Sequence, residues 1–215
     1  VMTQIIASVA SSQYGGQSVN IKHLGKYLFN TKKKYERKYK EQFWSELSDE
    51  QIQKLVEMRV KDELSSGVQT IQYQINTLMT TNGQSPFVTL FLELDEKDEY
   101  LEETAQIIEE ILNQRIQGIK NEAGIYITPA FPKLVYVLDE CNALKGGKYD
   151  YLTQIAVRCS AKRMYPDYIS AKKMAKSSSQ RFFTVSFMQI QALDMDSLAF
   201  SNCSFEVLGD ISGLY

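Results

Sequence analysis

The chain has 215 residues, of which 44% are hydrophobic and 11% aromatic, and its formal net charge is -2. This composition is typical of a globular protein with a hydrophobic core. The chain lacks the overall basic field that attracts nucleic acid and any apolar run long enough to cross a membrane, and we expect no signal peptide. Three widely spaced cysteines without a CxxC pattern, and a single histidine, predict reduced thiols in a cytoplasmic protein and argue against a zinc site built from Cys and His.

The first part of the chain is predicted to be helical. The opening segment, VMTQIIASVASSQYGG, places Met2, Ile5, Ile6 and Val9 on one helical side, and Gly15 and Gly16 then stop that helix. The helix begins without a capping residue, so we expect an upstream part to be missing. From Val19 to Leu47 the pattern predicts a basic helix in which lysines and arginines alternate with aromatic residues.

Two more helices are predicted between residues 48 and 79. Ser48, followed three residues later by Gln51, is a capping box for the first of them. Ser65-Ser66-Gly67 looks like a hinge that separates the two. The residues expected on their buried sides are Ile52, Leu55, Val56, Val60 and Leu64 in the first helix and Val68, Ile71, Ile75, Leu78 and Met79 in the second.

A polar turn then leads into a buried strand. The turn, residues 80–86, is rich in hydroxyl and amide groups, and the apolar run from Phe87 to Leu92 fits a strand covered on both faces. Nine acids and one lysine follow between Glu93 and Glu110, yet the spacing of the apolar residues there still predicts an amphipathic helix.

The second half of the chain repeats this alternation. A loop over 124–132 precedes a predicted strand, Lys133 to Leu138, and a predicted helix, Tyr151 to Met164. Helices that alternate with strands predict an α/β fold with parallel neighbours. In the tail, residues 176–179 resemble a linker, and Phe183, Val185 and Phe187 alternate as in a strand.

Two polar turns are candidate binding sites, because glycines let a backbone approach a phosphate and exposed amides can hold it. An alternative is that each turn only ends a helix, and the pattern alone favours that interpretation. The candidate residues are Ser12, Gln13, Tyr14, Gly15 and Gly16 in one turn and Asn82, Gly83, Gln84, Ser85 and Pro86 in the other.

The basic helix from Lys26 to Trp44 is a third candidate. Its charges could hold nucleotide phosphates, contact the acidic helix after Glu93, bind single-stranded nucleic acid, or be a solvated face. Asp139 and Glu140 follow a strand, where open α/β sheets bind ligands, but they could equally cap a helix. No catalytic triad, carboxylate pair or metal spacing is visible.

Four segments, in the same order, resemble the large subunit of the anaerobic (class III, glycyl-radical) ribonucleoside-triphosphate reductases. They are IASVASSQYGG, QTIQYQINTLMTTNGQSPFVTLFL, TPAFPKLVYVLDE and CSAKRMYPDYIS. The likeness runs from about Val1 to about Met174. It implies part of a ten-stranded α/β barrel, namely one half-barrel with its helices, from an internal fragment of that subunit.

The family resemblance also implies an activity and its partners. Members reduce ribonucleoside triphosphates to deoxyribonucleotides for DNA synthesis, as homodimers regulated by ATP and deoxynucleotide effectors. A radical-SAM activase installs a glycyl radical near the C-terminus, close to a zinc-type site, and the radical passes to a cysteine. This piece is expected to carry no cofactor itself, and neither a membrane nor nucleic acid is an expected partner.

By resemblance, Asn82 to Pro86 match the family's NGQ-(S/T)-P loop, and Ser12 to Gly16 match its serine–glutamine–tyrosine–glycine–glycine turn. Both are expected to lie near the nucleotide. The helices between them fall where the family builds its effector-binding dimer interface.

The sequence also departs from the family. The Met-Gly-Cys-Arg-Ser motif of the thiyl cysteine, expected soon after Ser170, is absent, and the surroundings of Cys203 (FSNCSF) do not match it. We therefore expect residues 1–174 to be a partial reductase barrel domain that is inactive alone. Residues 175–215 are expected to be a tail without family resemblance, from a frameshift or divergence. The rival hypothesis is a non-catalytic nucleotide-binding or dimerisation module.

Overall fold

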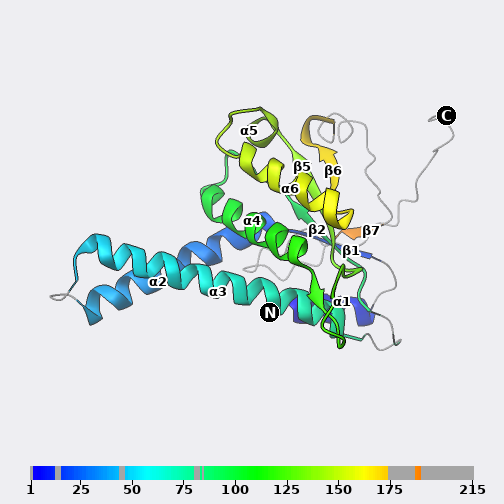
Figure 1. The fold of residues 1–215 in the computed structure, drawn as a ribbon, viewed down its shortest axis with the longest axis horizontal. Coiled ribbons are helices and arrows are strands. Elements are labelled where there is room, and N and C mark those ends of the chain that lie inside the picture. The colour runs from blue at the N-terminus through cyan, green and yellow to red at the C-terminus, as the bar shows by residue number, and fades with distance from the viewer. Residues whose placement is uncertain are drawn as a thin grey trace.

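The computed structural model describes residues 2–12, 16–43, 47–79, 83 and 85–173, together with the backbone of residues 187–189. Figure 1 shows a sheet with helices packed in front of it and a long helical hairpin that projects to one side. The larger helices are α1 (Met2–Ser12), α2 (Gly25–Gln42), α3 (Asp49–Thr77), α4 (Leu101–Gln117) and α6 (Asp150–Arg163), and the short ones are η1 (Ile21–Leu24) and α5 (Glu140–Ala143).

Five parallel strands form the main sheet. Their order is β6-β5-β2-β1-β7, and each pair of neighbouring strands in this sheet runs parallel. The predicted α/β fold with parallel neighbours is therefore confirmed. The strands are β1 (Gly16–Asn20), β2 (Val88–Leu92), β5 (Lys133–Leu138), β6 (Asp167–Ser170) and β7 (Phe187–Gln189), and a separate hairpin pairs β3 (Ile119–Lys120) with β4 (Tyr126–Ile127).

One face of the sheet carries the hydrophobic core. Strand residues alternate between faces, and most of those in β2 and β5 that point to the helices are fully buried. They pack against α3, α4 and α6 in one continuous cluster. The sheet contributes Val88, Leu90, Leu92, Leu134 and Tyr136 to this cluster, and the helices contribute Ile75, Ile108, Leu112, Leu152 and Ala156.

The opposite face of the sheet does not belong to that cluster. Ser18 and Thr89 are buried there, whereas Phe91, Val135 and Ile169 are only half-buried. Of the predicted strand, Val88 to Leu92 forms β2, and Phe87 stays 45% exposed. The prediction of a strand buried on both faces thus holds for most of β2 but not for Phe91 or Phe87.

Strand β1 lies where a continuous basic helix was predicted from Val19 onward, so that prediction was wrong at its start. The sequence GQSVN has little intrinsic strand preference. It is held as a strand because β2 and β7 pair with it on both sides. In addition, the buried Gln17 side chain donates to the carbonyl of Ile6 at 2.9 Å.

Helix α3 runs from Asp49 to Thr77 without the predicted hinge at Ser65–Gly67. A glycine inside a helix costs about 1 kcal/mol relative to alanine. Here Val60, Val68 and Ile75 pack on the core on both sides of that point, and Gln114 donates to the Ser65 carbonyl at 2.9 Å. Tertiary packing therefore overrides the local helix-breaking signal.

Several other predictions can now be judged. The capping box is confirmed. The backbone N–H of Ser48 donates to Gln51 Oε1 at 2.9 Å, and the backbone N–H of Gln51 donates to Ser48 Oγ at 3.3 Å. Strand β5 has the predicted bounds. Strand β6 and the β3–β4 hairpin were not predicted, and Leu55 and Met79 are exposed rather than buried. Among the described helices, none is apolar enough over a sufficient length to cross a membrane.

Candidate functional site

The two candidate turns enter neighbouring strands at the same edge of the sheet, the edge where the parallel strands begin. One turn ends at Gly16, the first residue of β1, and the other leads through Pro86 toward β2. The backbone N–H of Gln17 donates to the backbone carbonyl of Phe87 at 2.7 Å. We call this side of the sheet the amino edge. Gln13, Tyr14, Gly15, Asn82 and Gln84 lie outside the described residues.

The described candidates at the amino edge differ in their surroundings. Ser12 is exposed, and its hydroxyl donates to the Ser8 carbonyl at 2.9 Å, as in a helix end. Gly83 has φ +71°, a conformation that favours glycine, and an added Cβ there would meet no atom within 4 Å. Ser85 is half-buried and Pro86 is buried.

A segment before β5, residues 129–132, supports this edge from the other side. The ring of Phe131 lies 5.1 Å from the ring of Phe87, in an edge-on arrangement. Asn76, near the end of α3, donates to the Phe131 carbonyl at 2.9 Å. Arg115 of α4 donates to the carbonyls of Pro129, at 2.8 Å, and Pro132.

Arg115 was not singled out from the sequence, because it stands in a segment that looks acidic. Its spacing in the sequence could have revealed that it is buried. Arg115 lies seven residues after Ile108 and three after Leu112, both core residues, so it falls on the buried side of α4. Arg115 is 1% exposed, and burial lowers the pKa of its guanidinium to about 10. The Tyr165 ring lies 5.8 Å from Arg115 Cζ.

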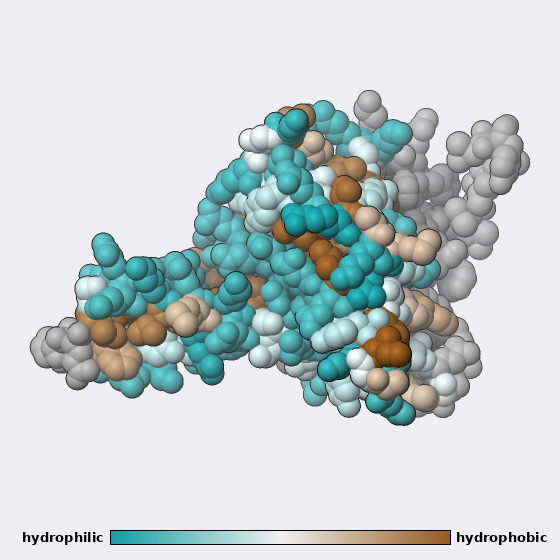
Figure 2. All heavy atoms as spheres, viewed as in Figure 1, coloured by the Kyte–Doolittle hydropathy of each residue, from teal (hydrophilic) through white to brown (hydrophobic). Residues whose placement is uncertain are grey.

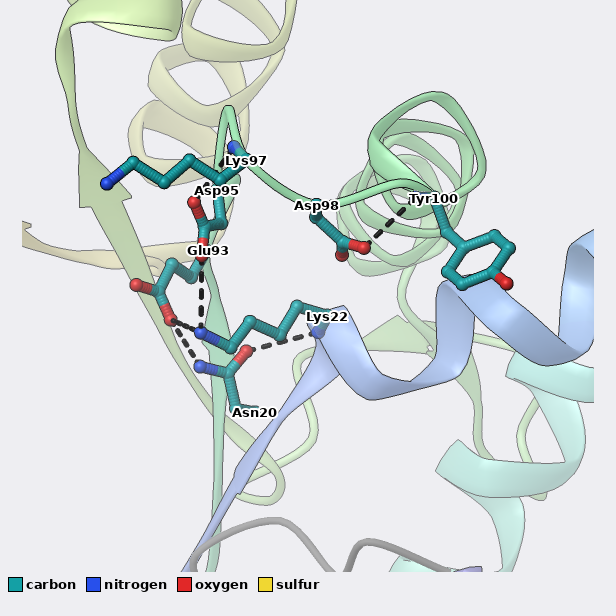
Figure 3. Close-up of polar contacts among 7 residues, drawn as sticks. All are labelled: Asn20, Lys22, Glu93, Asp95, Lys97, Asp98 and Tyr100. Carbon is teal, nitrogen blue, oxygen red and sulfur yellow. Dashed lines mark hydrogen bonds and ion pairs between the residues drawn. The ribbon is translucent and has the colours of Figure 1, made fainter.

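The opposite side, the carboxyl edge, is dense in charged groups that bind one another. Figure 3 shows Lys22, from the turn after β1, pointing at Glu93 and Asp95, which follow β2. Its Nζ lies 3.6 Å from Glu93 and 3.8 Å from Asp95. Asn20 accepts from the Lys22 amide at 3.1 Å and donates to Glu93. These contacts tie the ends of β1 and β2 together.

Other acids at the carboxyl edge serve as caps of turns and helices. Asp95 accepts from the Lys97 amide at 3.0 Å, and Asp98 accepts from the Tyr100 amide at the same distance, just before α4 begins. Asp139 forms a capping box at the start of α5, where it accepts from the Glu140 amide at 2.8 Å. Of the two interpretations for Asp139, the structure supports the cap.

The two described cysteines are free thiols, as predicted, and neither is poised to react. Cys141, half-buried at the carboxyl edge, has its pKa raised to about 11 by burial and then by Asp139 and Glu96. Cys159 is fully buried in α6, and burial raises its pKa to about 11. A thiol with such a pKa is almost entirely protonated at neutral pH.

Helix α2 offers a separate basic surface. An open hollow of about 960 Å³ lies along it. Where α2 meets α4, the ring of Phe29 lies 5.2 Å from that of Tyr100, so the basic helix does lie against the acidic one. The hollow is lined by Asn30, Lys33, Lys34, Glu36, Arg37, Lys40 and Glu41. We call this set the α2 surface.

Comparison with known proteins assigns the chain to a family. The model of the family "Anaerobic ribonucleoside-triphosphate reductase" matches residues 1–195, a span that includes the first part of the segment expected to be a tail. Strand β7, which pairs with β1, also lies in that part.

Curated relatives agree with this match. The anaerobic ribonucleoside-triphosphate reductase of Enterobacteria phage T4 is 36% identical over 177 residues, which is 80% of this chain and 27% of the relative. Those of Haemophilus influenzae and Escherichia coli are each 35% identical over 180 residues, 82% of this chain and 24% of the relative. The chain therefore spans about a quarter of the length of these relatives, and it belongs to the anaerobic ribonucleoside-triphosphate reductase family.

Proposed function

We propose that the chain forms the nucleotide-handling part of an enzyme that reduces ribonucleoside triphosphates to deoxyribonucleoside triphosphates. The observation that carries this proposal is the joining of the two candidate turns at the amino edge. The segments that end at Gly16 and lead through Pro86 are far apart in the sequence, yet the bond from the Gln17 amide to the Phe87 carbonyl brings them together. Both match motifs of the family.

The distribution of charge supports the amino edge over the carboxyl edge. A triphosphate carries several negative charges, and the carboxyl edge presents Glu93, Asp95, Asp139 and Glu140. Like charges at a few ångströms repel strongly wherever water is partly excluded. Moreover, Lys22 is already engaged by ion pairs with both Glu93 and Asp95.

We further propose that the sheet is part of the family's ten-stranded barrel. The support is its uneven coverage, since the described helices pack on one face of the sheet. On the other face, Phe91, Val135 and Ile169 are half-buried and outside the core cluster. A barrel wall has such a face, which points to the barrel interior.

Calorimetry of the 215-residue chain with ribonucleoside triphosphates tests the proposed binding edge. Ser85→Glu puts a negative charge at the amino edge and should weaken binding at least about tenfold through charge repulsion. The matched control is Ser170→Glu, because Ser170 is also a half-buried serine but lies at the carboxyl end of β6. Equal loss in both variants, or loss only in the control, would contradict the proposal.

The α2 surface favours a second candidate function, the binding of a deoxynucleotide effector at a dimer interface. Its lysines and Arg37 offer charge to phosphates, and Leu55 and Met58 of the neighbouring α3 are 38% and 66% exposed. Figure 2 shows hydrophobic side chains along the outer end of this helical hairpin, at the left of the view. Exposed apolar groups of this kind often mark an interface between protein chains.

Two variants of α2 separate an effector site from general attraction by a basic helix. Lys33→Glu changes a residue that lines the hollow, whereas Lys38→Glu makes the same charge change on the same helix away from the lining. Binding of a deoxynucleoside triphosphate should be lost in the first variant and kept in the second. Binding without turnover would favour the non-catalytic module, and measurable reduction by the chain alone would contradict the expected inactivity.

A further inference from the structure

Arg115 is a buried cation that has no carboxylate partner among the described residues. A buried charge without a counterion is costly, even when hydrogen bonds replace part of its hydration. Arg115 is 1% exposed, and its Nε has no hydrogen-bond partner in the described structure. A leucine in this position would fill the same side of α4 without that cost. The arginine therefore calls for a role that an apolar residue cannot fill.

The two carbonyls that Arg115 binds explain why an arginine stands there. Pro129 and Pro132 flank the short segment before β5, and prolines have no amide hydrogen with which to build a regular turn. The planar guanidinium offers donors in a fixed fork, so one side chain can hold two carbonyls at a set separation. Lysine, with its donors on a single atom, is less suited to this arrangement.

The segment held by Arg115 reaches the candidate site through two contacts. Asn76 binds the Phe131 carbonyl at 2.9 Å, and the Phe131 ring lies against the Phe87 ring at 5.1 Å. The Phe87 carbonyl in turn accepts from the Gln17 amide at 2.7 Å. An unbroken series of contacts thus connects Arg115 with the start of both β2 and β1.

We propose that Arg115 is a positioning residue: by holding the carbonyls of Pro129 and Pro132, it sets the place of Phe131 and through it the amino edge that binds nucleotide. The part of this inference that concerns nucleotide rests on the proposed function above. The part that concerns geometry stands on the contacts alone, so the two can fail separately.

Amide hydrogen exchange tests the geometric part without any ligand. In Arg115→Met the Gln17 amide should exchange about tenfold faster, while amides at Leu90–Leu92, at the other end of the same strand pair, keep their rates. The matched control is Arg163→Met. Arg163 also binds carbonyls, those of Ile116 and Gln117, but not the segment 129–132. If exchange became equally faster throughout the sheet, Arg115 would only stabilise the fold in general, and the proposal would be overturned.

Calorimetry with a ribonucleoside triphosphate tests the nucleotide part. At a temperature where all variants are folded, Arg115→Met should weaken binding about five- to tenfold, a factor within reach of one lost aromatic contact. Arg115→Lys should recover part of this loss, and Arg163→Met should bind normally. Wild-type chain that binds no nucleotide would refute the proposed function, whereas unchanged binding in Arg115→Met would refute the positioning role.

Phe131→Leu keeps the test decisive if Arg115→Met does not fold. This change leaves Arg115 and its two carbonyls in place and removes only the ring contact with Phe87. Faster exchange at Gln17, together with weaker binding, is the expected result. Unchanged exchange and unchanged binding in Phe131→Leu would break the series of contacts at its last step and overturn the proposal.

Discussion

The two edges of the sheet are formed by different kinds of residues. The amino edge has proline-flanked segments, an aromatic pair and one buried arginine. The carboxyl edge has many charged side chains, and several of them pair with one another or cap the next element.

This difference indicates that the usual position of ligands in α/β sheets is not enough to locate the binding site of this chain. Open sheets most often bind ligands beyond the carboxyl ends of their strands. Here the polar groups at that edge already have a structural task, since Glu93 binds Asn20 and Lys22, and Asp139 caps α5. The polar groups of the carboxyl edge are therefore weaker candidates for binding a ligand.

Gly25→Ala should give the largest effect, because the carboxyl edge is closely packed. An added Cβ at Gly25 would lie 2.5 Å from Thr104 Oγ1 and 2.9 Å from the Tyr100 carbonyl oxygen. We expect a loss of about 3 kcal/mol in the free energy of unfolding, measured with urea. Gly67→Ala is the control, since a Cβ there meets nothing within 4 Å and should stabilise α3 by about 0.5–1 kcal/mol. A similar loss in both variants would contradict tight packing at this edge.

Lys22→Met should have a smaller effect that separates structure from binding. Its two ion pairs are partly exposed, so their loss should cost about 0.5–1 kcal/mol, and less at high salt. Nucleotide affinity should not change, because Lys22 lies at the carboxyl edge. Lys172→Met breaks the more exposed pair with Glu140 and should cost less than Lys22→Met does. If Lys22→Met abolished nucleotide binding, the assignment of the edges would be reversed.

The pH dependence of stability sharpens the comparison further. Each described thiol has a pKa raised from 9.0 to about 11, in both cases chiefly by burial. The folded chain thus favours the protonated thiols, and this contribution is complete below pH 9 and disappears as the pH rises through 11. Cys141→Ala and Cys159→Ala should each flatten the decline of stability between pH 9 and pH 11, measured by urea unfolding.

Salt should distinguish the two cysteines. Asp139 and Glu96 of the carboxyl edge contribute to the shift of Cys141, whereas burial alone raises the pKa of Cys159, which lies near two arginines that lower it. Added salt screens the acids at the surface. The part of the decline that depends on Cys141 should therefore shrink, and an equal response of both variants to salt would contradict the account.

The sequence predicted elements whose local pattern agreed with their tertiary setting. The apolar residues of Lys133–Leu138 predict a buried strand, and the segment forms β5. Ser48 and Gln51 predict a capping box, and they form it at the start of α3. Strand β1 was missed because Gln17 and Ser18 are polar residues buried by partners distant in the sequence. The prediction of a hinge at Gly67 was wrong because the packing of α3 against the core outweighs the free-energy cost of one glycine in the helix.

The candidate site was only partly accessible from the sequence. Its turns stood out because polar groups gathered where a connection needed only a glycine. Their meeting at one edge depends on the parallel pairing of β1 with β2, which no local pattern specifies. Arg115 was hidden by the acidic composition of α4, although its spacing from Leu112 marked it as a buried cation.

The most direct test of the central claim is amide hydrogen exchange of the 215-residue chain with and without a saturating ribonucleoside triphosphate. We expect the nucleotide to slow exchange at the amino edge, in residues 16–18 and 85–90, and to leave residues 93–98 and 139–142 unchanged. Slower exchange confined to residues 93–98 and 139–142 would place the nucleotide at the carboxyl edge and contradict the account.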